Sequence, residues 1–169
     1  ASLAERARAR LRGQVLESAP LAPYTSFRIG GPAALLVTPA DRDDLRAALI
    51  FAVSEGLPVH VLGGGSNTLV RDGGFRGMAV HLAAFQGLER RADEVLAGAG
   101  VRISRLLAFC CRQGLAGLEI LSGVPGTVGG AVWGNAGAWG GAPADALATV
   151  DLLPASGGDI AFPRAAVPD

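Results

Sequence analysis

Glycine is concentrated in two short windows of this 169-residue chain, and that distribution limits the folds open to it. Of its 25 glycines, six lie within residues 63–77 and eight within residues 123–141. Glycine permits backbone conformations with positive φ and lets another molecule approach the main chain closely. Successive amides in such turns can form anion-binding concavities. Two separate concavities predict a ligand with phosphate groups in its middle.

Composition indicates a folded protein without a broad nucleic-acid surface. Hydrophobic residues make up 50% of the chain and charged residues 18%, which is far from a disordered composition. The formal net charge is zero, so nucleic-acid binding is not expected. All 15 basic residues are arginine, and the absence of lysine excludes a lysine Schiff base and an ordinary P-loop.

Nothing in the sequence indicates export or membrane insertion. Residues 1–12 carry four arginines but lead into no apolar signal region. No window approaches the roughly 18 apolar residues that a membrane span needs. Cys110 and Cys111 are adjacent in an apolar stretch, and we predict buried, reduced thiols. We therefore expect a cytoplasmic protein.

The first half of the chain is predicted to contain a strand–helix–strand unit that leads into the first glycine loop. In parallel α/β sheets, ligands usually bind at the carboxyl ends of the strands, where this loop would lie. Capping and periodicity signals give the element bounds. They predict a helix opened by Ser2 and Glu5 and running to about Glu17, strands at residues 33–38, 58–62, 67–71 and 78–82, and a helix at 41–54.

The second half is predicted to be a separate lobe that begins near Phe85. Residues 114–141 carry mainly turn and short-helix signals. We therefore expect an α+β fold of two lobes, residues 1–84 and residues 85–169. The elements predicted in the second lobe are a strand at 94–99, a helix at 101–113 and a hairpin of residues 149–153 and 159–162 around Ser156, Gly157 and Gly158.

Common catalytic patterns are missing from the sequence. The dinucleotide pattern G-x-G-x-x-G does not occur, and Thr68 stands where G-x-S-x-G needs its last glycine. The two histidines, His60 and His81, have no spacing that suggests a shared metal ion, so we expect no metal site. No residue is assigned a catalytic role.

The two glycine loops are the candidate binding elements. The first offers consecutive amides with the Ser66 hydroxyl and the Asn67 amide, more than one tight turn requires, so we predict phosphate binding. In the second, Thr127 is predicted to start a short helix whose amides face an anion. A flat ring could lie against residues 135–138. Core packing is expected for the flanking Trp133 and Trp139.

Three segments resemble the UDP-N-acetylenolpyruvoylglucosamine reductase (MurB) family, within the PCMH-type FAD-binding group that includes vanillyl-alcohol oxidase. They are Thr-Ser-Phe-Arg-Ile-Gly-Gly at residues 25–31, Val-Leu-Gly-Gly-Gly-Ser-Asn at 61–67, and the run of residues 117–141. They stand in the family's order, and the resemblance covers about residues 20–165. Within the wider group, the run from Ser122 to Ala131 followed by residues 135–137 is specific to this reductase.

The resemblance implies a flavoenzyme of peptidoglycan precursor synthesis, with FAD in the cleft of a two-lobed PCMH-type fold. NADPH would be the hydride donor, and UDP-N-acetylglucosamine enolpyruvate would be reduced to UDP-N-acetylmuramate. The resemblance assigns the FAD pyrophosphate to Gly63, Gly64, Gly65, Ser66 and Asn67. It assigns pyrophosphate and the isoalloxazine edge to Ser122, Gly123, Val124, Pro125, Gly126, Thr127, Gly130, Asn135, Ala136 and Gly137.

Family members continue into a motif close to Phe-Gly-Tyr-Arg and a substrate-binding domain with a catalytic serine and glutamate, whereas this chain stops at Asp169. We therefore expect the FAD-binding portion alone, a monomer that binds FAD weakly and has little reductase activity. One alternative is a related FAD oxidase or dehydrogenase of a hydroxy acid or alcohol. Another is a non-catalytic nucleotide-binding module that holds a UDP-sugar.

Overall fold

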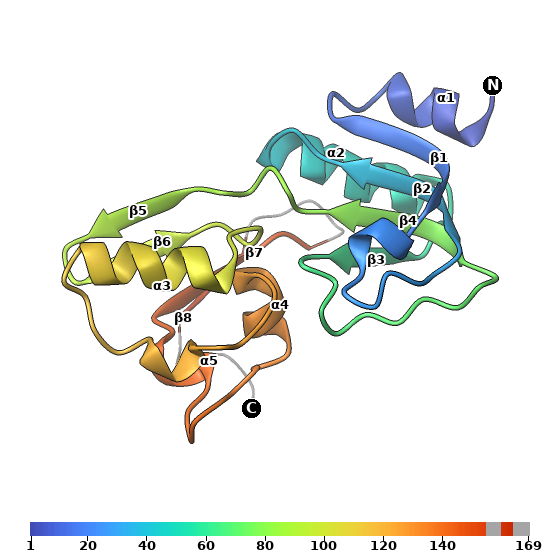
Figure 1. The fold of residues 1–169 in the computed structure, drawn as a ribbon. Coiled ribbons are helices and arrows are strands. Elements are labelled where there is room, and N and C mark those ends of the chain that lie inside the picture. Colours follow the sequence, from blue (N-terminus) through green and yellow to red (C-terminus); the bar gives the residue numbers. More distant parts are fainter. Residues whose placement is uncertain (155–159, 164–169) are drawn as a thin grey trace. The chain divides into compact units, whose positions relative to one another are not determined.

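The computed structural model describes residues 1–154 and 160–163, which form two compact units (Figure 1). Unit 1 comprises residues 1–84 with residues 153–154, and unit 2 comprises residues 85–152 with residues 160–163. Helices and strands alternate irregularly in both units, in agreement with the predicted α+β class. The turn predicted around Ser156, Gly157 and Gly158 lies outside the described residues.

Unit 1 is built on a mixed four-stranded sheet with the order β1-β2-β4-β3. β1 and β2 are antiparallel, whereas β2 and β3 each pair in parallel with β4. β4 is therefore central, although it is the last of the four in the sequence. The elements of the unit are α1 (Leu3–Arg8), β1 (Gln14–Pro20), η1 (Ala22–Tyr24), β2 (Pro32–Thr38), α2 (Arg42–Ser54), β3 (Val59–Leu62) and β4 (Phe75–His81).

The two faces of this sheet carry separate apolar clusters, because successive strand side chains point to opposite faces. One face packs against α1 and α2, and its Leu35, Val37, Met78 and Val80 share a buried cluster with Phe51 of α2. The second cluster contains different residues of the same strands and joins η1 to the strand ends. Its buried members are Ala19, Leu21, Ala33, Leu36, Leu62 and Ala79, with Tyr24 and Val70 packed against them.

The N-terminal helix is shorter than predicted. Its capping box is confirmed, since the Ser2 N–H donates to Glu5 Oε2 (2.7 Å) and the Glu5 N–H donates to Ser2 Oγ (3.2 Å). The helix ends at Arg8, however, and residues 14–20 form β1 by pairing with β2 along their length. The prediction of a helix to Glu17 is wrong, because long-range strand pairing outweighs a weak local helical preference.

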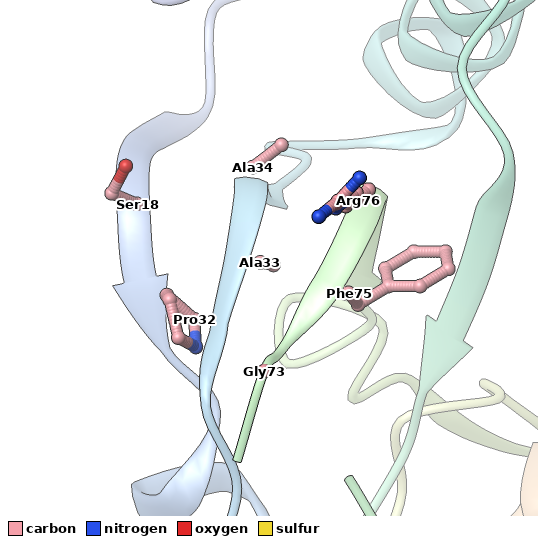
Figure 2. Close-up of a pocket in the computed structure, with 7 residues that line it drawn as sticks. All are labelled: Ser18, Pro32, Ala33, Ala34, Gly73, Phe75 and Arg76. Atoms are coloured by element: carbon pink, nitrogen blue, oxygen red, sulfur yellow. The ribbon is translucent and has the colours of Figure 1, made fainter. Parts of the chain in front are cut away.

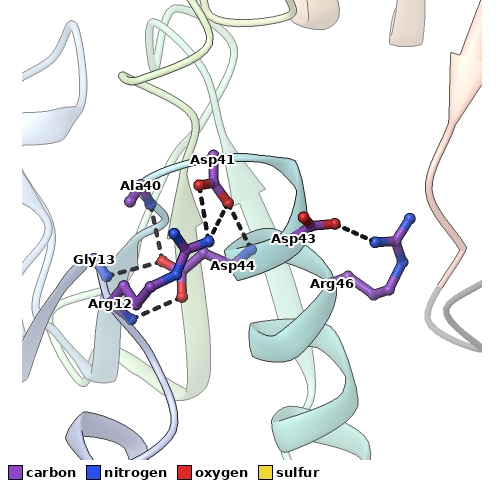
Figure 3. A network of polar contacts seen from close by, with 7 residues as sticks. All are labelled: Arg12, Gly13, Ala40, Asp41, Asp43, Asp44 and Arg46. Carbon is purple, nitrogen blue, oxygen red and sulfur yellow. Dashed lines mark hydrogen bonds and ion pairs between the residues drawn. The ribbon is translucent and has the colours of Figure 1, made fainter.

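The carboxylate of Asp44 holds together the start of β1 and the start of α2 (Figure 3). Asp44 is 2% exposed and accepts the backbone N–H groups of Arg12 (2.8 Å), Gly13 (2.8 Å) and Ala40 (2.9 Å). Burial alone raises the pKa of this carboxyl, but the three N–H donors outweigh it and hold the pKa below its ordinary value. Asp41 caps α2, as predicted, and pairs with the Arg12 guanidinium.

Unit 2 has two small hairpins and short helices. The predicted pairing near the C-terminus is confirmed, since β7 and β8 are antiparallel, while β5 was not predicted. Cys110 is buried, which raises the pKa of its thiol, but Cys111 is exposed, against expectation. The elements are β5 (Leu88–Arg91), β6 (Glu94–Ala97), α3 (Ile103–Arg112), η2 (Glu119–Leu121), α4 (Val128–Trp133), α5 (Pro143–Ala146), β7 (Thr149–Leu152) and β8 (Ile160–Pro163).

Candidate functional site

Loop one, residues 63–67, follows β3 at the carboxyl end of the parallel strands, where the sequence placed it. The Leu82 N–H donates to the Leu62 carbonyl (3.1 Å), so the parallel pairing continues to the start of the loop. At the end of β4, the His81 ring meets Tyr24 edge-on, with 5.1 Å between ring centroids. Residues 67–71 were predicted to be a strand and are not one. The Arg71 carbonyl instead accepts N–H groups from Gly31 and Gly74.

The backbone N–H groups of loop one donate no hydrogen bond to the described residues. Among the described residues, no acceptor is recorded for the N–H groups of the five successive residues Gly63 to Asn67. The loop is held through its other groups: the Gly65 carbonyl accepts the Ser26 N–H (3.0 Å), and Ser26 Oγ lies 3.4 Å from Ser66 Oγ. Unpaired main-chain donors at a strand end suit an anion. Ser26 was not among the predicted site residues, although it lies in a segment that carried the family resemblance.

Gly65 is required by the chain itself. It is buried and has φ +65°, and a Cβ at this position would collide with the Tyr24 carbonyl oxygen and lie 2.8 Å from Thr25 Cα. The absence of a side chain at position 65 is thus explained by the close approach of residues 24–25. The argument for phosphate binding rests on the free N–H groups, and not on the glycine content.

In loop two, residues 122–137, many backbone N–H groups donate hydrogen bonds to acceptors within unit 2. Thr127 caps α4 as predicted, but the first four N–H groups of the helix all have acceptors within unit 2. The prediction that these helix amides face an anion is therefore wrong. The acceptors are the Val101 carbonyl for Val128 (2.8 Å), the Ala99 carbonyl for Gly129 (2.9 Å), Thr127 Oγ1 for Gly130 (3.4 Å) and the Thr127 carbonyl for Ala131 (2.9 Å).

The turn that precedes α4 keeps some free donors. Within the described part of the chain, the N–H groups of Gly123, Gly126 and Thr127 have no recorded acceptor, whereas those of Ser122 and Val124 bond within the turn. Gly123 and Gly126 have φ values of +83° and +104°. A Cβ at Gly123 would meet no atom within 4 Å, so this turn presents an open backbone surface.

The two tryptophans are exposed, against the predicted core packing. Trp133 is 94% exposed and Trp139 is 83% exposed. Trp139 is nevertheless held, because its indole N–H donates to the Ser122 carbonyl (2.9 Å). Asn135 between them has φ +39°, and its Oδ1 accepts the Ala144 N–H (3.2 Å), so it organises the loop. Gly137 has no room for a side chain beside the Gly141 carbonyl oxygen, 2.6 Å from its Cβ position.

A shallow pocket of about 230 Å³ lies elsewhere in unit 1, and neither loop lines it. Figure 2 shows Ser18 and Arg76 on either side of the β2 strand, with Ala34 between them. The pairing of β2 with both neighbours is irregular here, and Ser18 has φ +48°. The pocket includes the first residues of β2 and β4, at the opposite end of the parallel strands from loop one. It is therefore not the predicted site.

In the residues that the structure describes, no three His, Cys, Asp or Glu side chains are grouped as metal ligands would be. None of the helices in those residues combines the length and the apolar character that crossing a membrane requires.

The sequence matches the FAD binding domain family over residues 33–160. It is 49% identical over 156 residues to the UDP-N-acetylenolpyruvoylglucosamine reductase of Geobacter sulfurreducens, covering 92% of this chain and 52% of that protein. The similarly named protein of an Anaeromyxobacter species is 50% identical over 150 residues, 88% of this chain and 47% of the relative. The chain thus spans about half the length of the curated relatives it matches.

Solved structures give the same family and the same fold. MurB from Thermus caldophilus superposes with a TM-score of 0.73 at 34% identity, covering 92% of this chain and 53% of that chain. The 6-hydroxy-D-nicotine oxidase of Arthrobacter nicotinovorans has a TM-score of 0.72 at 20% identity, over 90% of this chain and 36% of that one. The second likeness concerns the fold alone.

Proposed function

Because the chain belongs to the family of FAD binding domains, we propose that it forms the FAD-binding part of a UDP-N-acetylenolpyruvoylglucosamine reductase. The reaction of the whole enzyme would be the reduction of UDP-N-acetylglucosamine enolpyruvate to UDP-N-acetylmuramate, with NADPH as hydride donor. The observation that carries the proposal is the row of five unpaired amides in loop one, in a chain about half identical to proteins with that name. Bound FAD supplies the hydride-transfer chemistry.

The residues of each loop suit a different part of FAD. The amides of residues 63–67 would hold the pyrophosphate, since their N–H groups are free and the Ser66 hydroxyl lies beside them. In loop two, the free N–H groups of Gly123, Gly126 and Thr127 would bind and orient the cofactor. The open backbone at Gly123 leaves room for a flat ring, and we assign the isoalloxazine edge to loop two, together with Gly130, Asn135, Ala136 and Gly137.

The cellular setting is part of the proposal. We propose a cytoplasmic monomer that acts in peptidoglycan precursor synthesis and does not bind nucleic acid. The zero net charge supports the last point, because nucleic-acid affinity comes mainly from clustered cationic side chains.

Flavin binding tests the proposal directly. The purified chain is titrated with FAD, and binding is followed by the change in flavin fluorescence and in the visible absorbance band. We expect saturable binding that ADP competes away, because ADP carries the same diphosphate. Failure to bind FAD at millimolar concentration, in a chain shown to be folded by circular dichroism, would contradict the proposal. UDP-sugar binding without flavin binding would favour a nucleotide-binding module.

A further inference from the structure

We propose that Arg28 supplies the positive charge that neutralises the nucleotide diphosphate bound at loop one. This inference rests on the proposed function and extends it to a residue outside both glycine loops. Backbone amides are neutral dipoles, whereas a diphosphate carries negative charge that a guanidinium pairs with strongly and often bidentately. Loop one itself contains no cationic side chain.

Arg28 lies on a turn that is fastened to loop one. The Arg28 N–H donates to the Thr25 carbonyl (3.1 Å), which closes a four-residue turn whose ends lie within about 7 Å. Inside this turn, the Ser26 N–H donates to the Gly65 carbonyl (3.0 Å). The start of the turn also touches the loop, because Gly65 packs directly on Tyr24 and Thr25. The long Arg28 side chain is therefore based next to the unpaired amides.

The turn holds Arg28 in an unfavourable backbone conformation. Its φ is +54°, in the left-handed region that a non-glycine residue rarely adopts. Thr25 is buried, and its Oγ1 lies 3.0 Å from the Ile29 carbonyl and within hydrogen-bonding distance of the Ala22 carbonyl (3.2 Å), so it ties both ends of the turn. Gly31 packs against the Asp72 backbone. Such strain persists only where the surroundings enforce it, and it is concentrated at functional sites.

The Arg28 side chain has no partner within the described part of the chain. No hydrogen bond or ion pair is recorded for it, whereas Arg6 pairs with Glu55 and Arg12 pairs with Asp41 in the same unit. Its neighbours Phe27 and Ile29 are 67% and 52% exposed, so an apolar surface flanks the unpaired cation. The guanidinium and the neighbouring free N–H groups suit the phosphates of an adenine dinucleotide, and the flanking apolar side chains suit its adenine ring.

The test compares three variants of the full chain. Arg28→Gln removes the charge and keeps a long side chain, and Arg28→Lys keeps the charge. Arg76→Gln is the matched control, because Arg76 is also exposed in unit 1 but lines the pocket at the other end of the parallel strands. FAD, ADP and riboflavin are titrated against each protein by fluorescence and calorimetry, at low and at physiological salt. Urea unfolding shows whether each variant remains as stable as the unsubstituted chain.

We expect Arg28→Gln to weaken FAD and ADP binding about tenfold, the size typical of a charge-assisted hydrogen bond, and to reduce the salt dependence. Arg28→Lys should restore most of the affinity, and Arg76→Gln should leave it unchanged. Riboflavin has no phosphate, so its affinity should be the same in all four proteins. Equal FAD affinity in Arg28→Gln and the unsubstituted chain would overturn this inference and leave the proposed function standing. Absence of FAD binding by the unsubstituted chain would overturn both.

Discussion

Loop one and loop two have similar glycine-rich sequences but use their backbones differently. In loop one, five successive N–H groups have no acceptor among the described residues, and the loop is held by the Gly65 carbonyl, the Ser66 hydroxyl and a close backbone approach. In loop two, the N–H groups of the helix that starts after Thr127 are all taken up within unit 2. A high glycine content therefore indicates only that other atoms come close to the backbone. Whether the N–H groups are left over for a ligand has to be read from the hydrogen bonds of each loop.

The glycines also differ in what they make room for. In loop one, position 65 accommodates another part of the same chain, the Tyr24 carbonyl. In loop two, position 123 faces open space although its φ is also positive. A glycine with positive φ and open space at its Cβ position can contact a ligand. A glycine whose Cβ position is occupied by other backbone atoms is needed for the fold itself.

The largest effect is expected at Gly65. Gly65→Ala combines a left-handed φ with a collision against the backbone of residues 24–25, and we expect a loss of roughly 3 kcal/mol in the free energy of unfolding. Gly123→Ala is its matched control: the same strain without the collision should lower stability by about 1 kcal/mol. Urea denaturation of both variants measures the difference. Equal losses would show that the close approach of residues 24–25 to position 65 does not add to the cost of a side chain there.

Acid should lower the stability of unit 1, which carries loop one, because it protonates the Asp44 carboxylate. The pKa of this carboxyl is lowered in the folded chain, so its stabilisation is present above the ordinary aspartate value of about 3.9 and is lost as pH falls below it. Asp44→Ala leaves three partly buried N–H groups without this acceptor, and we expect a loss of about 2 kcal/mol at pH 7.

Urea unfolding at pH 7 and at pH 3 measures this effect, and hydrogen exchange shows which unit opens. The unsubstituted chain should lose more stability on acidification than the Asp44→Ala variant, and protection should fall first in β1 and β2. An identical pH dependence in the two proteins would rule out Asp44 as the source.

The smallest effect is expected at the tryptophans of loop two. Trp139→Phe removes the indole N–H that reaches the Ser122 carbonyl, which should lower stability by about 1 kcal/mol or less. Trp133→Phe is the control, because this ring is exposed and no hydrogen bond from it to the described residues is recorded. Thermal unfolding compares the two variants, and a larger loss for Trp133→Phe would show that the Trp139 hydrogen bond does not stabilise loop two more than the exposed Trp133 ring does.

Local signals in the sequence predicted the local structure well. The Ser2–Glu5 capping box, the Asp41 cap and the apolar run of β2 all lie where predicted, because each depends on residues a few positions apart. The position of loop one followed from the alternation of strand, helix and strand. The identity of the site residues came from motif resemblance, and the free amides of residues 63–67 are compatible with it.

Non-local contacts explain the errors. β1 is a strand because it pairs with β2, and Arg12 reaches Asp44 across 32 positions, a contact with no sequence pattern. Tryptophan is usually buried, but Trp139 is held by one hydrogen bond at its edge, and its ring remains exposed. Hydrogen bonds of the α4 amides to residues 99–101 likewise depend on packing that periodicity does not encode.

The position of β4 has a consequence for the order in which the chain is made. β2 and β3 both pair with β4 and not with each other, so once β3 has been made, β2 is paired only with β1 and β3 has no partner strand. The 19 residues from Gly63 to His81 take on the order of seconds to synthesise. Throughout that interval loop one is attached to an unpaired strand. Loop one therefore gains a fully paired strand as its base only after the central strand β4 has been translated and inserted.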